Sequence, residues 1–171
     1  MRDITERKEA EEALRANEER FRTVADYAYV WEYWRGRDGR FRYVSPSCQR
    51  RTGYSLEDFM TDPALVERII YADDHKRIVS HFRHESPTSG PFAAEFRIVS
   101  KEGEERWIEH ICQPVYGADQ RWLGQRASNR DITDRKRAEL ELRRRVEALE
   151  ESLSEQAGGV VRRRQLRPAW R

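Results

Sequence analysis

A fourteen-residue segment occurs twice in this chain, once at its start and once near its end. RDITERKEAEEALR begins at Arg2, RDITDRKRAELELR begins at Arg130, and the two agree at ten of fourteen positions. Asp3 and Asp131 lie 128 residues apart. That period is too long for a solenoid, whose repeats run roughly 20 to 50 residues, but it fits one small domain. We therefore predict one complete domain, preceded by the tail of another unit and followed by the same junction.

Aromatic residues indicate where the core lies. Residues 21–133 hold four of the five Trp, all seven Tyr and all six Phe, whereas 1–20 and 134–171 are mostly Glu, Arg, Lys, Ala and Leu. The formal net charge is +2, which favours no class of partner. No apolar run approaches the roughly 18 residues of a membrane span, and the start of the chain lacks a signal-peptide core. We expect a cytoplasmic protein without membrane insertion by this segment.

The two charged arms each carry an apolar seam with alternating spacings of three and four residues, as in a coiled coil. Each seam covers only about two heptads, fewer than the three to four of a firm coiled-coil assignment. An amphipathic helix packed on its own domain is the alternative, but a matching seam on both sides of one core favours a parallel homodimer. The predicted dimer positions are Leu14, Asn17, Phe21, Val24, Leu142, Val146, Leu149 and Leu153.

The middle of the chain predicts an antiparallel sheet interrupted by helices. Residues 29–35 alternate, and GRDG separates them from RFRYVS, which indicates a hairpin. Residues 46–85 predict three helices, with a capping box at Ser55 and Asp58 and a longer helix from Asp73 and Asp74. Three further strands follow, in FAAEFRIVS, EERWIEHICQPVY and RWLGQRASNRDIT. The predicted class is α+β, with five antiparallel strands and helices on one face.

Two stretches carry a resemblance to a known family. RFRYVSPSCQRRTGYSLEDF, with its Y-x-S-P start and T-G-Y end, resembles the second strand and following helix of PAS domains (the PAS/PAC sensory box). KEGEERWIEHICQPVYGADQRWLGQRASNRDITDRK resembles the last three strands, with their closing D-I-T. Many members have His-Pro-Asp-Asp before the long helix, where this chain has Tyr-Ala-Asp-Asp at 71–74.

The resemblance implies a division of the chain and a role for it. We expect a linker helix over 1–22, the PAS domain over 23–133, a signalling helix over 134–157 and a basic disordered tail over 158–171, beyond Gly158-Gly159. The implied function is a sensory and dimerisation module of a larger histidine kinase or diguanylate cyclase type of protein, with neighbouring PAS and output domains. A ligand-free interaction domain is the alternative. The junction Asp131, Ile132 and Thr133 would relay the signal.

PAS domains bind ligands between sheet and helices, so strand alternation selects candidates for a pocket. The more apolar face of the strands should point to the helices, and Trp107 should lie on the other face. The predicted pocket residues are Trp31, Tyr33, Ala94, Phe96, Ile98, Ile108, His110, Cys112 and Arg126.

Four alternatives remain for the pocket: a small metabolite, no ligand, haem or flavin. Flavin photochemistry of the LOV subclass is disfavoured, because Ile98 and Ile108 occupy what resemble its amide positions and Cys48 lies outside its N-C-R-F setting. Haem would use a histidine of the long helix or His110, and a non-covalent flavin would stack on aromatic side chains such as Trp31. Neither cysteine lies in a C-x-x-C motif, and no metal site is predicted.

No catalytic motif is present. The sequence has no phosphate loop, H-E-x-x-H, G-x-S-x-G, phosphoacceptor H-E-x-R-T-P or G-G-D-E-F. We expect that this chain is not itself an enzyme. The basic segment RRRQLRPAWR near the end is short and lies outside a folded motif, so we expect no nucleic-acid partner.

Overall fold

The computed structural model describes residues 2–83 and 90–164. The chain divides into two compact units, Met1–Ile132 and Thr133–Arg171. The first unit contains the sheet, the helices that cover it and an N-terminal helix, α1 (Arg2–Asp26). The second consists, in its described part, of one long helix, α6 (Thr133–Arg164).

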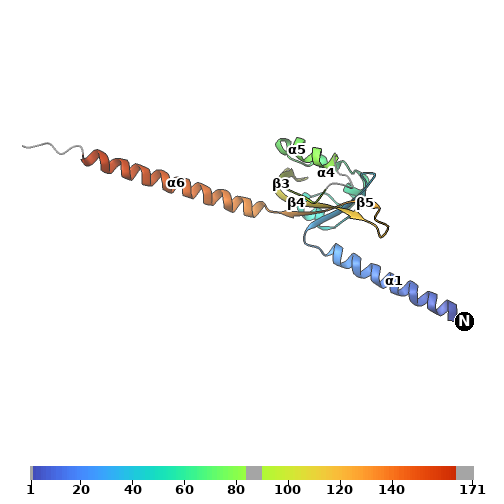
Figure 1. Ribbon diagram of the computed structural model, residues 1–171. Coiled ribbons are helices and arrows are strands. Elements are labelled where there is room, and N and C mark those ends of the chain that lie inside the picture. Colours follow the sequence, from blue (N-terminus) through green and yellow to red (C-terminus); the bar gives the residue numbers. More distant parts are fainter. Residues whose placement is uncertain (1, 84–89, 165–171) are drawn as a thin grey trace, which may run out of the picture. The chain divides into compact units, whose positions relative to one another are not determined.

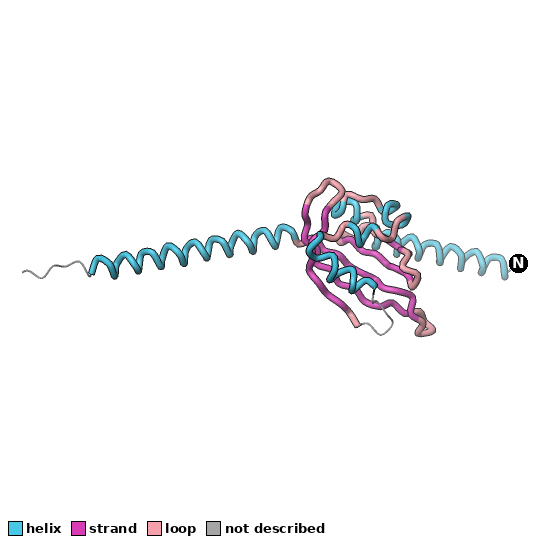
Figure 2. Tube along the Cα trace, turned by 90° about the horizontal axis from the view of Figure 1, so that it is seen from above, coloured by secondary structure: helices cyan, strands magenta, loops and turns pink. Residues whose placement is uncertain are grey.

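The first unit is built on one five-stranded antiparallel sheet (Figure 2). Its strands are β1 (Trp31–Gly36), β2 (Phe41–Val44), β3 (Phe92–Val99), β4 (Glu105–Tyr116) and β5 (Trp122–Asp131). They lie in the order β2-β1-β5-β4-β3, so the first and last strands of the chain pair at the centre. The predicted α+β class and five-stranded sheet are confirmed.

Four short helices connect β2 to β3 where the sequence predicted three. They are α2 (Ser47–Thr52), α3 (Leu56–Thr61), α4 (Leu65–Arg68) and α5 (Ala72–Arg83), and α4 and α5 lie over one face of the sheet (Figure 1). The predicted capping box is present: Ser55 Oγ accepts from the Asp58 N–H at 3.1 Å, and Asp58 Oδ2 accepts from the Ser55 N–H at 2.8 Å. Together these bonds satisfy two N–H groups of the first turn of α3.

The core lies between the helices and the face of the sheet that they cover, called here the inner face. Trp31 and Phe59 have ring centroids 5.4 Å apart, and the Tyr33 and Phe41 rings meet edge to face at 5.2 Å. The helices add buried side chains from each segment: Cys48, Phe59, Leu65, Val66, Ile78, Val79 and Phe82. Burial of these apolar surfaces is the main term that holds the helices on the sheet.

The Y-x-S-P segment fixes the end of β2 against the start of β1. Ser45 Oγ accepts from the Glu32 N–H at 2.8 Å, and the Ser45 N–H donates to the Glu32 carbonyl at 2.8 Å. Ser47 Oγ donates to the Val30 carbonyl at 2.8 Å. Both serines are fully buried, so their hydroxyl groups meet backbone groups that water cannot reach.

Helix α5 is attached to β3 by one carboxylate. Asp74 Oδ2 accepts from the backbone N–H and from Nε of Arg97, each at 2.9 Å. Partial burial raises the pKa of the Asp74 carboxyl, but the hydrogen bonds from Arg97 outweigh this and leave that pKa below its usual value.

Two boundaries differ from those predicted. Helix α1 continues to Asp26, beyond the predicted domain start at residue 23. Helix α6 runs through Gly158-Gly159 to Arg164, because a glycine inside a helix costs only about 1 kcal/mol relative to alanine. The rest of the predicted tail, residues 165–171, lies outside the described residues.

Gly124 should be essential for the centre of the sheet. It pairs with Gly36 at a positive φ of 128°, and a Cβ there would overlap the Arg35 carbonyl oxygen. We expect Gly124→Ala to lower the free energy of unfolding by about 2 kcal/mol or more, measured by urea denaturation. Gly90→Ala, where a Cβ meets nothing within 4 Å, is the control and should change little. Equal stability of the two variants would contradict this packing.

The Asp74 contact predicts a pH-dependent stability. Because the folded pKa lies below the unfolded one, the contact contributes above the usual aspartate pKa and is lost as pH falls through the folded value. Asp74→Asn should therefore lower the melting temperature at neutral pH, and its difference from wild type should shrink towards pH about 3. Asp73→Asn is the control. The Asp73 side chain is 75% exposed, so its ion pair with Arg97 contributes little to stability. A difference that stays constant with pH would be evidence against this ion pair.

Candidate functional site

Most of the predicted pocket residues come together on the inner face. Antiparallel pairing sets His110 opposite both Ala94 and Asn129, and Cys112 opposite Ala127. Ala94 is partly buried, and seven of the predicted residues are buried: Trp31, Tyr33, Phe96, Ile98, Ile108, His110 and Cys112. Side chains that pair across strands point the same way, so alternation along β3 and β4 identified this face correctly.

Arg126 lies on the opposite, outer face of the sheet. It pairs with Trp34 and Gln113 in the strand register, and its Nη2 donates to Glu32 Oε2 at 2.7 Å. The inward positions of β5 are Gln125, Ala127 and Asn129. Asp131 pairs with the buried Ile108, so residues an even number of positions from Asp131 on β5 point inward. This rule would have excluded Arg126 and selected Gln125 and Asn129.

His110 is held in one orientation by Asn129. The Asn129 amide group donates to the Trp31 carbonyl at 3.2 Å, which turns Oδ1 towards His110 Nδ1 at 2.8 Å. An acceptor at that position requires that Nδ1 carry the proton. Nε2 of His110 then carries a lone pair and can only accept. It is buried, and the described residues offer it no hydrogen-bond partner. Burial lowers the pKa of His110 to about 4, although the hydrogen bond with Asn129 raises it. The ring is therefore neutral at neutral pH.

His81, on α5, brings a second imidazole to the same place. Its Nε2 lies 3.1 Å from Cys112 Sγ, and its ring stacks on Phe92 with centroids 3.6 Å apart. Burial, followed by the charge of Arg35, lowers the pKa of His81. One ligand atom from each of His81, His110 and Cys112 lies within 4.8 Å of the others. The sequence predicted no metal site, because these residues come from two separate elements with no motif spacing.

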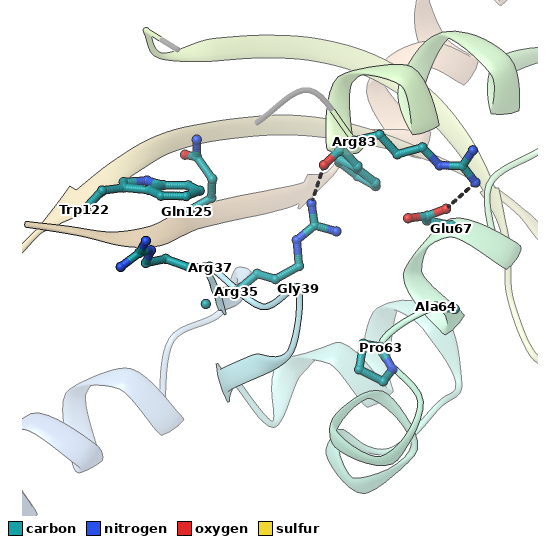
Figure 3. A pocket seen from close by; sticks show the side chains of 11 residues that line it. Arg35, Arg37, Gly39, Pro63, Ala64, Glu67, Arg83, Trp122 and Gln125 are labelled. Carbon is teal, nitrogen blue, oxygen red and sulfur yellow. Dashed lines mark hydrogen bonds and ion pairs between the residues drawn. The ribbon is translucent and has the colours of Figure 1, made fainter. Parts of the chain in front are cut away.

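A polar pocket of about 320 Å³ opens beside this core (Figure 3). Arg35 Nη2 donates to the Phe82 carbonyl at 2.9 Å, and Arg83 pairs with Glu67 at 3.4 Å across the pocket. Gln125 is 2% exposed, and in the part of the chain that the structure describes its Oε1 has no hydrogen-bond partner. None of these residues was predicted, since polar residues near turns gave no periodic signal. The lining residues are Arg35, Gly36, Arg37, Gly39, Pro63, Ala64, Glu67, Phe82, Arg83, Trp122 and Gln125.

A second hollow, of about 570 Å³, lies on the outer face beside the end of α1. Two of the predicted dimer residues, Phe21 and Val24, line it together with Trp34 and Tyr43. Both are at least 60% exposed, as is Leu14 on the same helix, and Asn17 is exposed too. In α6 the seam residues Leu142, Val146, Leu149 and Leu153 are 45–65% exposed. Both seams are therefore uncovered in the single chain.

The predicted junction begins with a partly buried ion-pair cluster. Asp131 Oδ2 lies 3.3 Å from Arg106 on β4 and 3.7 Å from Arg51 on α2. The next residue, Ile132, donates its N–H to the Trp107 carbonyl at 2.9 Å. Asp131 thus joins the end of β5 to its neighbouring strand and to a helix of the core. Thr133 is the first residue of α6.

Comparisons with known proteins identify the fold. A family model described as PAS fold matches residues 41–124. The crystal structure of a PAS domain from Colwellia psychrerythraea is 26% identical, with a TM-score of 0.58 over 68% of this chain and 97% of that one. A sensory box histidine kinase/response regulator from Burkholderia thailandensis matches with a TM-score of 0.57, at 24% identity over 77% of this chain and 98% of that chain. These matches show that the domain has the PAS fold.

Curated relatives are much longer proteins. An uncharacterized protein of Sinorhizobium fredii, y4lL, is 30% identical over 82% of this chain and 17% of its own length. The blue-light-activated histidine kinase of Brucella ovis is 28% identical over 56% of this chain and 18% of its own. The chain therefore spans less than a fifth of either relative. Proteins with a similar domain include a blue-light-activated histidine kinase and a sensory box histidine kinase/response regulator.

Among residues 2–83 and 90–164, none of the helices combines the length and the apolar character that crossing a membrane requires.

Proposed function

We propose that this chain senses and dimerises within a larger signal-transduction protein of the histidine kinase or diguanylate cyclase type, and that it lacks catalytic activity of its own. A change at the inner face would pass along β4 and β5 to Asp131, and from there to α6. The PAS domains of a histidine kinase and of a diguanylate cyclase with a PAS/PAC sensor support this class of parent protein.

The observation that carries the proposal is the ion-pair cluster of Asp131. Its carboxylate is 11% exposed and lies between two arginines from different elements. Charges that are partly shielded from water interact more strongly than exposed ones, so a small displacement of β4 or α2 changes the energy of this contact. The cluster lies two residues before α6 begins. That position suits a contact that reports the state of the core to a following helix.

A ligand-free interaction domain remains the second candidate. The uncovered seams of α1 and α6 and the apolar hollow on the outer face favour it. In this case the domain would dimerise without binding a ligand, and the activity of the larger protein would not respond to a ligand at this domain.

The relay can be tested in the complete protein that contains this chain. Asp131→Ala should leave the domain folded and abolish regulation of output, measured as autophosphorylation for a kinase or cyclic dinucleotide synthesis for a cyclase. Asp38→Ala is the control, because Asp38 forms an ion pair with Arg42 in an exposed turn, at 3.0 Å. Regulation that survives Asp131→Ala, in a protein with unchanged expression, would falsify the relay.

Dimerisation can be tested on the chain itself. Leu142→Glu combined with Leu149→Glu places charges in the seam of α6, where burial against a partner would be costly. We expect a dimer for wild type and a monomer for the double variant, by light scattering coupled to size exclusion. Arg144→Glu alters charge outside the seam and should remain dimeric. A monomeric wild type, or a double variant that stays dimeric, would contradict the seam.

A further inference from the structure

The inner face contains a set of donors for which the sequence predicted no metal site. We propose that His81, His110 and Cys112 form a binding site for a single thiophilic d¹⁰ metal ion, Cu⁺ or Zn²⁺. The inference depends on the geometry of these side chains and is independent of the relay proposed above.

The distances are close to those that a metal ion needs. Metal bonds of about 2.0–2.1 Å to imidazole nitrogen and about 2.3 Å to thiolate sulfur place ligand atoms about 3.3–3.6 Å apart in a tetrahedral site. Here the His81 nitrogen and the Cys112 sulfur are 3.1 Å apart, and the three ligand atoms lie within 4.8 Å of one another. Side-chain movements of about an ångström would therefore complete the site.

The second observation is the unsatisfied nitrogen of His110. Its ring is fully buried, and Nε2 has no hydrogen-bond partner among residues 2–83 and 90–164, which is costly for a polar atom in a protein core. Asn129 fixes the proton on Nδ1 and so leaves a lone pair on Nε2. Metal-binding histidines are characteristically oriented in this way, by a hydrogen bond on the other ring nitrogen. A metal ion bound at Nε2 would give this buried nitrogen a partner.

The surroundings favour a soft ion with low charge. Cys112 would bind as thiolate, releasing its proton to solvent, while both histidines remain neutral. With Cu⁺ the site is neutral, whereas Zn²⁺ leaves one positive charge buried near Arg35, whose charge acts on both histidines. Soft thiolate ligands select Cu⁺ and Zn²⁺ among common metals. Three protein donors suit three-coordinate Cu⁺, and Zn²⁺ would add a water or another small ligand as a fourth.

Binding can be measured with the untagged full chain. Cu⁺ is titrated without oxygen in competition with a chromophoric Cu⁺ chelator, and Zn²⁺ with a zinc indicator. Co²⁺, a spectroscopic probe for Zn²⁺, should add a thiolate-to-metal charge-transfer band. We expect one ion per chain, a rise in melting temperature on binding, and tighter binding of Cu⁺ than of Zn²⁺.

Two ligand variants and two matched controls locate the site. His81→Phe retains a ring to stack on Phe92 but removes the nitrogen donor, and Cys112→Ala removes the thiol. Each should weaken binding by at least about tenfold, and Cys112→Ala should abolish the charge-transfer band. The controls are His75→Phe, at an exposed position of the same helix, and Cys48→Ala. The Cys48 thiol donates to the Tyr54 carbonyl at 3.7 Å, and the cluster of donors contains Cys112 and not Cys48.

The outcomes separate the site from its ion. Stoichiometric binding of Zn²⁺ with weaker binding of Cu⁺ would support the site and overturn the charge argument. The proposal is overturned if neither ion binds the wild-type chain stoichiometrically, or if His81→Phe and Cys112→Ala, both still folded by thermal unfolding, bind as tightly as wild type.

Discussion

The antiparallel pairing of β4 with β5 is the constraint on which the rest of this structure depends. The ladder runs from Ile108 opposite Asp131 to Tyr116 opposite Trp122. Because successive side chains alternate between faces, this one register decides which residues face the helices. A shift by one residue would bring Arg126 inward and turn Asn129 outward.

The same register places the inner-face donors close to the junction. His110 pairs with Asn129, and Asn129 precedes Asp131 by two residues on the same strand, a separation of about 7 Å. Asp131 in turn forms an ion pair with Arg106 on β4. A change at His110 and a change at Asp131 therefore act on one pair of strands, and the proposed input and output contacts share a rigid element.

Much of the fold could be predicted from the sequence because its signals are local. The hairpin around GRDG, the capping box at Ser55 and the alternation along β3 and β4 each depend on a few neighbouring residues, and the structure contains all three. The end of α6 was predicted wrongly. Two glycines destabilise a helix only moderately, and the helix-forming residues on both sides of them continue it.

What could not be predicted depends on tertiary contact. The approach of His81 to Cys112 joins residues 31 positions apart, and it requires that α5 dock over β4. Arg126 was predicted on the inner face but lies on the outer face, because the register of β5 was not used to decide which of its side chains point inward. The sequence predicted that an arginine would pair with Asp131 but not which one. Arg51 and Arg106 reach it from different elements.

Amide hydrogen exchange at Ile132 tests most directly whether Asp131 holds the end of the sheet. The Ile132 N–H donates to the Trp107 carbonyl at 2.9 Å, so it reports on β5 where the strand leaves the domain. We predict slow exchange in wild type, much faster exchange in Asp131→Ala, and unchanged protection where β1 pairs with β2. If Ile132 exchanges at the same rate in both proteins, Asp131 does not hold this end of the sheet, and the proposed route from the inner face to α6 is wrong.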